Sequence, residues 1–130
     1  MSLVHTHTTP ADSFRRITGL VLMSLGGLAL LGSATAKFAH VPKVVEELER
    51  LGFEGGKLTL VAVFEILSGI LFLVPATRSP GLLLVSAYLG GAIATHVQHD
   101  DPALAPAVLL LLIWAGFWLR DMVSRQVRSG

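Results

Sequence analysis

The sequence predicts an all-α protein, a four-helix transmembrane bundle with a short amphipathic helix between spans one and two. Two observations predict it. The mean hydropathy is +0.67 and only 15% of the residues are charged, whereas soluble chains carry about 25%. Four long apolar runs also follow one another, and each approaches the ~20 residues that a helix needs to cross a bilayer. The expected spans cover residues 17–38, 57–75, 80–97 and 103–120.

Composition excludes several classes of function. The formal net charge of +1 and the lack of a basic patch interleaved with aromatics argue against a nucleic acid partner. Without cysteines there is no disulfide or thiolate metal site, and no other recognised metal-ligand pattern occurs. We expect one membrane domain over residues 14–121, with the lipid bilayer as its partner. A disordered tail over residues 1–13 and a C-terminal tail over residues 122–130 would flank it.

The first span follows Arg15 and Arg16. Residues 17–36 carry no charge, which gives about 30 Å of helix, the thickness of the hydrocarbon core. An alternative is a signal peptide, because the arginine pair, the apolar run and Ala-Thr-Ala at 34–36 together resemble one. The run is longer than the ~7–15 residues of a usual signal-peptide core, which favours a span. Small residues in the run allow close helix packing: Gly26, Gly27, Gly32, Ser33 and Ala36.

The longest polar interval contains a predicted amphipathic helix over residues 42–51. Its apolar residues recur at helical spacing, and charged residues take the other positions: Val44, Val45, Leu48 and Leu51. Pro42 suits the first turn of this helix, and Gly52 suits its C-terminal cap. We expect the helix to lie on the membrane surface or to cover one end of the bundle.

Spans two and three form a predicted antiparallel hairpin, since only residues 76–80 connect them. Span three carries rows of small residues spaced four apart, such as Ser86, Gly90 and Ala94, which are compatible with a homodimer. Span four carries no charge and ends near Trp118, a usual place for an interfacial aromatic residue.

Charge predicts the orientation of the bundle. An even number of spans places both termini on one side of the membrane, and that side holds more cations: Arg15, Arg16, Arg78, Arg120, Arg125 and Arg128. The opposite side holds fewer cations, diluted by acidic residues: Lys37, Lys43, Arg50 and Lys57. The positive-inside rule therefore predicts that both termini lie in the cytoplasm.

Span two carries Glu65 near its middle, where a charge costs about 2.5–3.5 kcal/mol on insertion scales. This carboxylate must therefore find a partner, take up a proton or face water. Helical rise places Glu65 about 12 Å below the outer boundary, with Tyr88 of span three at about the same depth. Lys37 and His96 would lie above them at the outer mouth, and Trp114 near the midplane on span four. These positions predict an outward-opening polar pocket, with Glu65, Tyr88 and His96 as catalytic candidates and Lys37 and Trp114 as cofactor-binding candidates.

Each candidate also has a purely structural interpretation. Glu65 could serve only to fix the bundle through hydrogen bonds, and Lys37 could extend from its helix end to the membrane interface. His96 could be an ordinary interfacial residue. Tyr88 and Trp114 could pack as buried aromatic residues.

Several of these features resemble the DoxX-like family of small bacterial membrane proteins. They are the stretch Ser-Ala-Tyr-Leu-Gly-Gly-Ala-Ile-Ala-Thr-His-Val at 86–97, Glu65 in its apolar run, Lys37-Phe38 after span one, and Trp-x-x-x-Trp-Leu-Arg-Asp at the exit of span four. The likeness extends from about residue 16 to 121. It implies a four-helix, multi-pass protein of the bacterial cytoplasmic (inner) membrane. Some relatives are subunits of quinone-linked sulfur-compound oxidoreductases or join membrane complexes against oxidative stress.

Three functions follow as hypotheses. The first is a redox-associated subunit of a membrane oxidoreductase complex, with a quinone as cofactor between spans two and three and with Glu65 or His96 exchanging protons. Because the sequence has no haem or flavin motif, its electrons would come from a partner subunit. The second is a small proton-coupled carrier that uses Glu65, since small multidrug transporters are also four-span chains with one essential intramembrane glutamate. The third is a non-catalytic assembly or scaffold protein.

Overall fold

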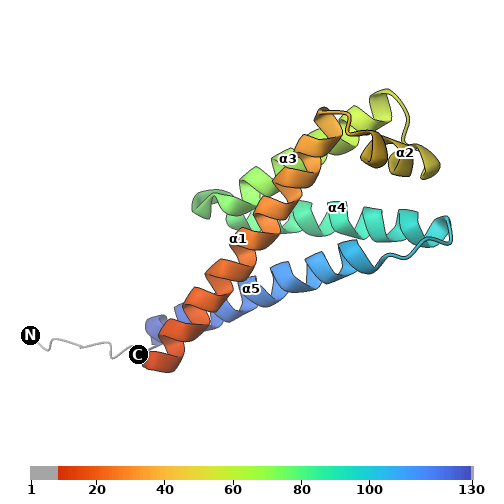
Figure 1. Ribbon diagram of the computed structural model, residues 1–130. Helices are drawn as coiled ribbons and strands as arrows, with labels where there is room; N and C mark the ends of the chain where they lie inside the picture. Colours follow the sequence, from red (N-terminus) through yellow and green to blue (C-terminus); the bar gives the residue numbers. More distant parts are fainter. Residues whose placement is uncertain (1–8, 130) are drawn as a thin grey trace, which may run out of the picture.

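The structure is a computed structural model that describes residues 9–129. In this range the chain forms helices that are linked by short connections (Figure 1). Within residues 9–129, four helices are long and apolar enough to cross a membrane. This confirms the prediction of an all-α bundle with four spans. The elements are α1 (Pro10–Phe38), α2 (Pro42–Arg50), α3 (Gly56–Leu73), the 3-10 turn η1 (Pro75–Thr77), α4 (Arg78–Gln98) and α5 (Leu104–Ser129).

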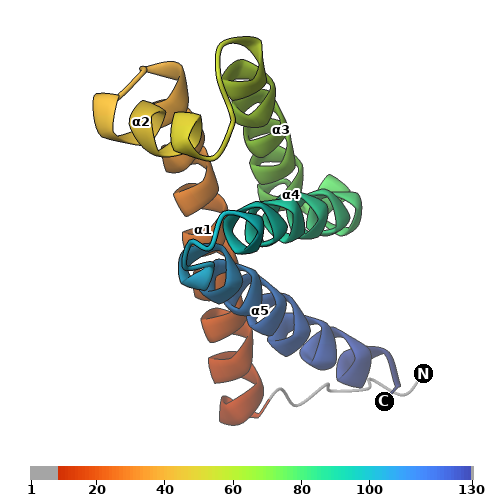
Figure 2. The same ribbon diagram turned by 90° about the vertical axis from the view of Figure 1, so that its right-hand side faces the viewer.

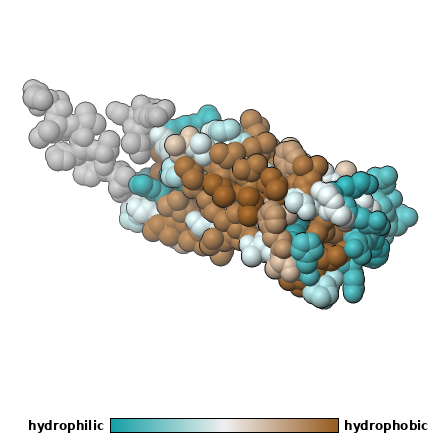
Figure 3. Space-filling model, turned by 90° about the horizontal axis from the view of Figure 1, so that it is seen from above, coloured by the Kyte–Doolittle hydropathy of each residue, from teal (hydrophilic) through white to brown (hydrophobic). Residues whose placement is uncertain are grey.

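The long helices pack in a ring, in which α1 and α4 each contact both α3 and α5. The start of α1 and the end of α5 lie at one end of the molecule, called here the termini end (Figures 1 and 2). Helix α2, the start of α3 and the α4–α5 connection lie at the other, the α2 end. A broad apolar surface separates polar residues at the two ends (Figure 3), as expected for helices whose flanks contact lipid.

The core is built by apolar side chains from all four long helices. Glycines let α1 approach its neighbours closely: a Cβ on Gly19 would lie 2.8 Å from the carbonyl oxygen of Gly116 on α5. Gly26 faces Ile113 of α5, whereas Gly32 faces open space. Close packing of small residues therefore occurs on α1, but on only part of the predicted set. The core side chains are Met23, Leu30, Phe72, Leu82, Val85, Leu89 and Ile113.

Helix α1 begins earlier than expected, because Thr9 and Asp12 form a capping box. The Thr9 hydroxyl oxygen accepts a hydrogen bond from the Asp12 amide at 3.3 Å, and the Asp12 carboxylate accepts one from the Thr9 amide at 3.2 Å. Residues 10–13, expected in the disordered tail, are therefore the first turn of α1. Residues 1–8 of that expected tail lie outside the described residues.

Two further boundaries bear on the sequence-based expectations. Helix α5 continues to Ser129, so residues 122–129 extend the last helix in place of the expected C-terminal tail. Helix α2 matches its expected range to within a residue. Gly52 follows it with a φ of 84°, in the left-handed region that commonly ends a helix.

Candidate functional site

A buried ion pair joins α1 to α3. The Nζ of Lys37, in the last turn of α1, donates a hydrogen bond of 2.6 Å to Oε2 of Glu65, near the middle of α3. Lys37 and Glu65 are only 6% and 2% exposed. Of the three outcomes expected for Glu65, the structure therefore has the first: the carboxylate finds a partner.

The local sequence of α1 positions this pair. Ser33 and Lys37 lie one helical turn apart and so share a face. The Lys37 ammonium donates a second hydrogen bond, of 2.7 Å, to Oγ of Ser33. An ammonium has three N–H donors, and the described residues supply acceptors for these two. One donor of Lys37 is therefore left for a ligand or water.

The pair borders an open cavity of about 540 Å³ at the α2 end, lined by residues of α1, α2, α3, α4 and the start of α5. This volume lies within the range of about 300–1,000 Å³ that is usual for small-molecule sites. Its polar lining includes Ser33, Lys37, Glu65, Tyr88 and His96. Apolar side chains form the rest of the walls, among them Leu30, Val44, Leu48, Leu51, Phe53, Val61, Phe64 and Leu109. The cavity therefore suits an amphipathic ligand.

Four of the five predicted site residues border this one cavity. Tyr88 of α4 lies beside the Glu65 carboxylate, as the depth estimate predicted. Lys37 is nearer to Glu65 than expected, because its long side chain extends into the bundle instead of remaining at the outer mouth. His96 lines the same cavity at its α2 end.

Trp114 is the residue that the structure does not bring to the cavity lining. Its indole Nε1 donates a hydrogen bond of 3.0 Å to Oγ of Ser86 on α4. The residue is 45% exposed and packs edge-on against Phe117, with ring centroids 6.3 Å apart. Helical rise gives the depth of a residue but not its direction around the helix axis, so the depth estimate could not place this side chain.

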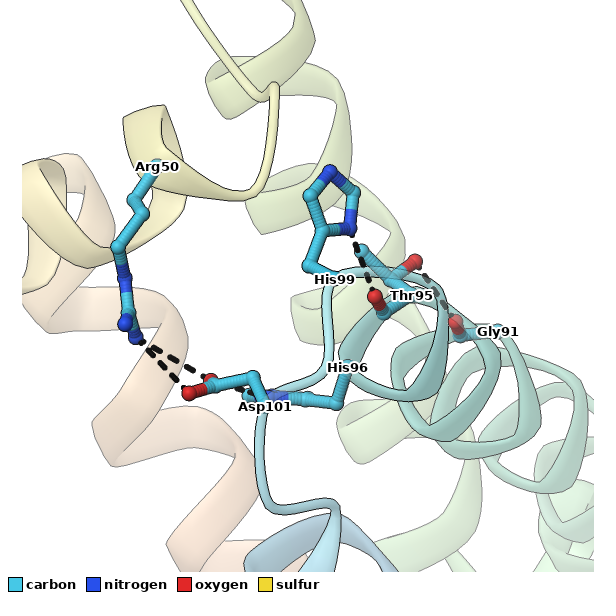
Figure 4. A network of polar contacts seen from close by, with 6 residues as sticks. All are labelled: Arg50, Gly91, Thr95, His96, His99 and Asp101. Carbon is cyan, nitrogen blue, oxygen red and sulfur yellow. Dashed lines mark hydrogen bonds and ion pairs between the residues drawn. The ribbon is translucent and has the colours of Figure 1, made fainter.

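Sequence reasoning missed a polar network that holds α2 over the cavity (Figure 4). Nη2 of Arg50 donates to both carboxylate oxygens of Asp101 at 3.2 Å. His96 Nδ1 lies 2.9 Å from Oδ2 of the same aspartate. We call Arg50, His96 and Asp101 the latch, because they connect α2 to the α4–α5 connection. The only signal for it was the presence of charged or titratable residues in two polar intervals, with Arg50 in one and His96 and Asp101 in the other.

The latch makes the position of α2 sensitive to acid. The hydrogen bond from His96, aided by the charge of Arg50, holds the pKa of Asp101 below its ordinary value of 3.8. A carboxylate with a lowered pKa stabilises the folded arrangement above its ordinary pKa. That stabilisation is lost as the pH falls through the lower pKa of the folded state.

We therefore expect Asp101→Asn to loosen the contact between α2 and the α4–α5 connection at pH 7, whereas the wild type loses that contact only as the pH falls through the lowered pKa of Asp101. The chain has no cysteines, so spin labels on Glu49→Cys and Val97→Cys report the distance from α2 to the end of α4. Pulsed electron paramagnetic resonance should give a narrow distance distribution for the wild type and a broad one for Asp101→Asn. Asp100→Asn, a change at the neighbouring position outside the latch, serves as the control. A narrow distribution in Asp101→Asn would show that the latch does not hold α2.

A protein-family model matches most of the chain. The model of the DoxX-like family matches residues 12–116. The chain belongs to the DoxX-like family. This DoxX-like protein is therefore a multi-pass membrane protein, and all the residues that line its cavity lie within the matched range. No curated protein and no solved structure matches the chain.

Proposed function

We propose that this DoxX-like protein is a redox-associated subunit of a membrane oxidoreductase complex and that its cavity binds a quinone. The observation that carries the proposal is the buried Lys37–Glu65 pair on the wall of an otherwise largely apolar cavity of about 540 Å³. A quinone has an apolar ring and tail, which suit the cavity walls, and carbonyl oxygens, which need hydrogen-bond donors.

The residues at the pair fit such a ligand. Lys37 retains one N–H donor beyond those that bond Ser33 and Glu65. The Tyr88 phenol lies beside the carboxylate and donates its one O–H toward Glu65, so its oxygen is left as an acceptor for a ligand O–H. A bound quinone would supply electron-acceptor chemistry, and its reduction consumes protons. In this proposal Lys37 orients the ligand, the Glu65 carboxylate accepts and returns protons, Tyr88 positions that carboxylate, and His96 passes protons to and from the α2 end.

The proposal also assigns partners and a location. Electrons would reach the site from a partner oxidoreductase subunit, because the sequence has no haem or flavin motif. The protein would lie in the bacterial cytoplasmic membrane with both termini in the cytoplasm, so that the cavity opens on the outer side. A second copy could pack on α4 at Gly90, where an added Cβ would meet open space.

The packing of the core favours binding over transport. A proton-coupled carrier must connect its site to both sides of the membrane. Here the core between the cavity and the termini end contains fully buried side chains, among them Leu30, Phe72, Val85 and Ile113. The ion pair therefore borders the cavity, and packed side chains separate it from the termini end.

We expect the protein to retain a stoichiometric quinone when it is extracted gently from its own membrane. Ala92→Phe should reduce retention at least about tenfold, equivalent to ~1.4 kcal/mol of binding free energy, because it places a ring where Ala92 lines the cavity. Ala94→Phe is the matched control, since Ala94 is exposed and does not line the cavity. Native mass spectrometry, followed by solvent extraction and identification of the bound molecule, measures the retention.

Three results would contradict the proposal. Protein that carries only phospholipid or a second copy of itself would favour a scaffold. Binding of lipophilic cations that depends on pH and is lost in Glu65→Gln would favour a carrier. Equal retention of quinone in both phenylalanine variants would place the quinone outside the cavity.

A further inference from the structure

A second cluster of charge lies at the termini end, away from the cavity. Arg78 is the first residue of α4, and Arg120 lies on α5, shortly after the 61% exposed Trp118. An exposed tryptophan at the end of an apolar run is typical of the membrane interface. Both arginines therefore lie near the level of the lipid headgroups.

Arg78 is fixed by the end of α3. Its Nε donates a hydrogen bond of 3.3 Å to the carbonyl oxygen of Phe72, and its Nη2 donates one of 3.3 Å to that of Leu73. These carbonyls belong to the last turn of α3, where helical partners are missing. Arg78 thus presents a held positive charge beside the α3–α4 turn.

Arg120 is held against α1 and has an unused donor. The α5 backbone is so close that a Cβ on Gly19 would lie 3.2 Å from the Arg120 amide nitrogen. The Nη1 atom of Arg120 is buried and has no hydrogen-bond partner among the described residues. Leaving a buried polar group without a partner is costly, and more so when the group is charged. This nitrogen therefore indicates a missing acceptor.

The two charges also lack a counter-charge. Arg120 is close enough for its charge to act on Arg78. In the described part of the chain neither arginine pairs with a carboxylate. The neighbouring acid Asp121 instead accepts a hydrogen bond of 2.7 Å from Arg125. Like charges in a partly buried setting repel strongly unless an anion lies between them.

We propose that Arg78 and Arg120 bind the phosphate group of an anionic phospholipid at the termini end. The planar guanidinium matches the oxygens of a phosphate with parallel hydrogen bonds. An anionic headgroup neutralises the pair and supplies the acceptor that Nη1 of Arg120 lacks. The site is separate from the cavity, and it does not depend on the function proposed for the cavity.

The test uses the full-length protein in micelles that contain phosphatidylglycerol or phosphatidylcholine, with native mass spectrometry as the readout. The wild type should retain one phosphatidylglycerol in preference to phosphatidylcholine. Arg120→Gln should weaken that retention about fivefold, the effect of one arginine charge near an anionic lipid. Arg125→Gln is the control, because Arg125 is exposed and already paired with Asp121.

Unchanged phosphatidylglycerol retention in Arg120→Gln would overturn the proposal, as would equal retention of the two lipids by the wild type. Displacement of the lipid by millimolar inorganic phosphate would support recognition of the phosphate group and identify free phosphate as a second source of it. Circular dichroism verifies that Arg120→Gln is folded. If it is not, the thermal stability of the wild type decides, since failure of phosphatidylglycerol to stabilise it more than phosphatidylcholine would refute the site.

Discussion

Glu65→Gln is expected to lower the free energy of unfolding by about 3–5 kcal/mol, because it leaves the Lys37 ammonium buried without its counter-charge. Lys37→Met should have an effect of the same order, since it leaves the carboxylate unpaired. Desolvation makes each isolated charge costly in this position, and only the hydrogen-bonded pair offsets that cost. Unfolding of each variant in detergent, followed by circular dichroism, measures the change.

The double variant Lys37→Met/Glu65→Leu tests what the pair is for. Replacing a buried ion pair by apolar residues of similar size is often neutral or stabilising, so the double variant should recover most of the stability that each single variant loses. The interaction energy comes from the double-mutant cycle. A double variant that is stable but no longer retains quinone would assign the pair to ligand binding. If Glu65→Gln and Lys37→Met were each as stable as the wild type, the two side chains would not form a buried ion pair.

The sequence located one half of this site more easily than the other. Glu65 is conspicuous because it interrupts an apolar run, where a charge is costly. Its partner Lys37 lies at a helix end, where lysines commonly extend to the interface. Lys37 can reach Glu65 because α1 packs closely and antiparallel against α3. The packing is so close that a Cβ added to Gly69 of α3 would lie 3.2 Å from the Leu31 side chain of α1. The sequence alone does not reveal this packing.

The latch and the arginine cluster could not be predicted for a different reason. Arg50 and Asp101 are 51 residues apart, and each lies in a polar interval where charged residues are ordinary. The four spans were predictable because lipid requires a long apolar surface, and long apolar runs are visible in the hydropathy of the sequence. Charges outside the spans face no such requirement, so their pairing depends on the tertiary arrangement.

Gly81→Ala is expected to destabilise the protein by about 3 kcal/mol, at the upper end of the usual range for overpacking. Gly81 lies where α4 turns back along α3, and a Cβ there would be 2.5 Å from the Leu71 carbonyl carbon and would also overlap the Phe72 amide nitrogen. These are backbone atoms, which cannot move aside as a flexible side chain would. The substitution must therefore separate the two helices or shift one along the other.

Gly32→Ala provides the matched control, because Gly32 also lies inside a helix but a Cβ there meets open space. Its expected effect is neutral or a gain of roughly 0.5–1 kcal/mol, from the lower conformational entropy of alanine in the unfolded chain. The free energies of unfolding of both variants in detergent distinguish the effect of close helix packing at Gly81 from the effect of helix propensity. Equal stability of Gly81→Ala and the wild type would show that the hairpin relaxes. A loss of stability in Gly81→Ala but not in Gly32→Ala would show that the contact at Gly81 fixes the register of α3 against α4. That register in turn sets the position of Tyr88 beside Glu65.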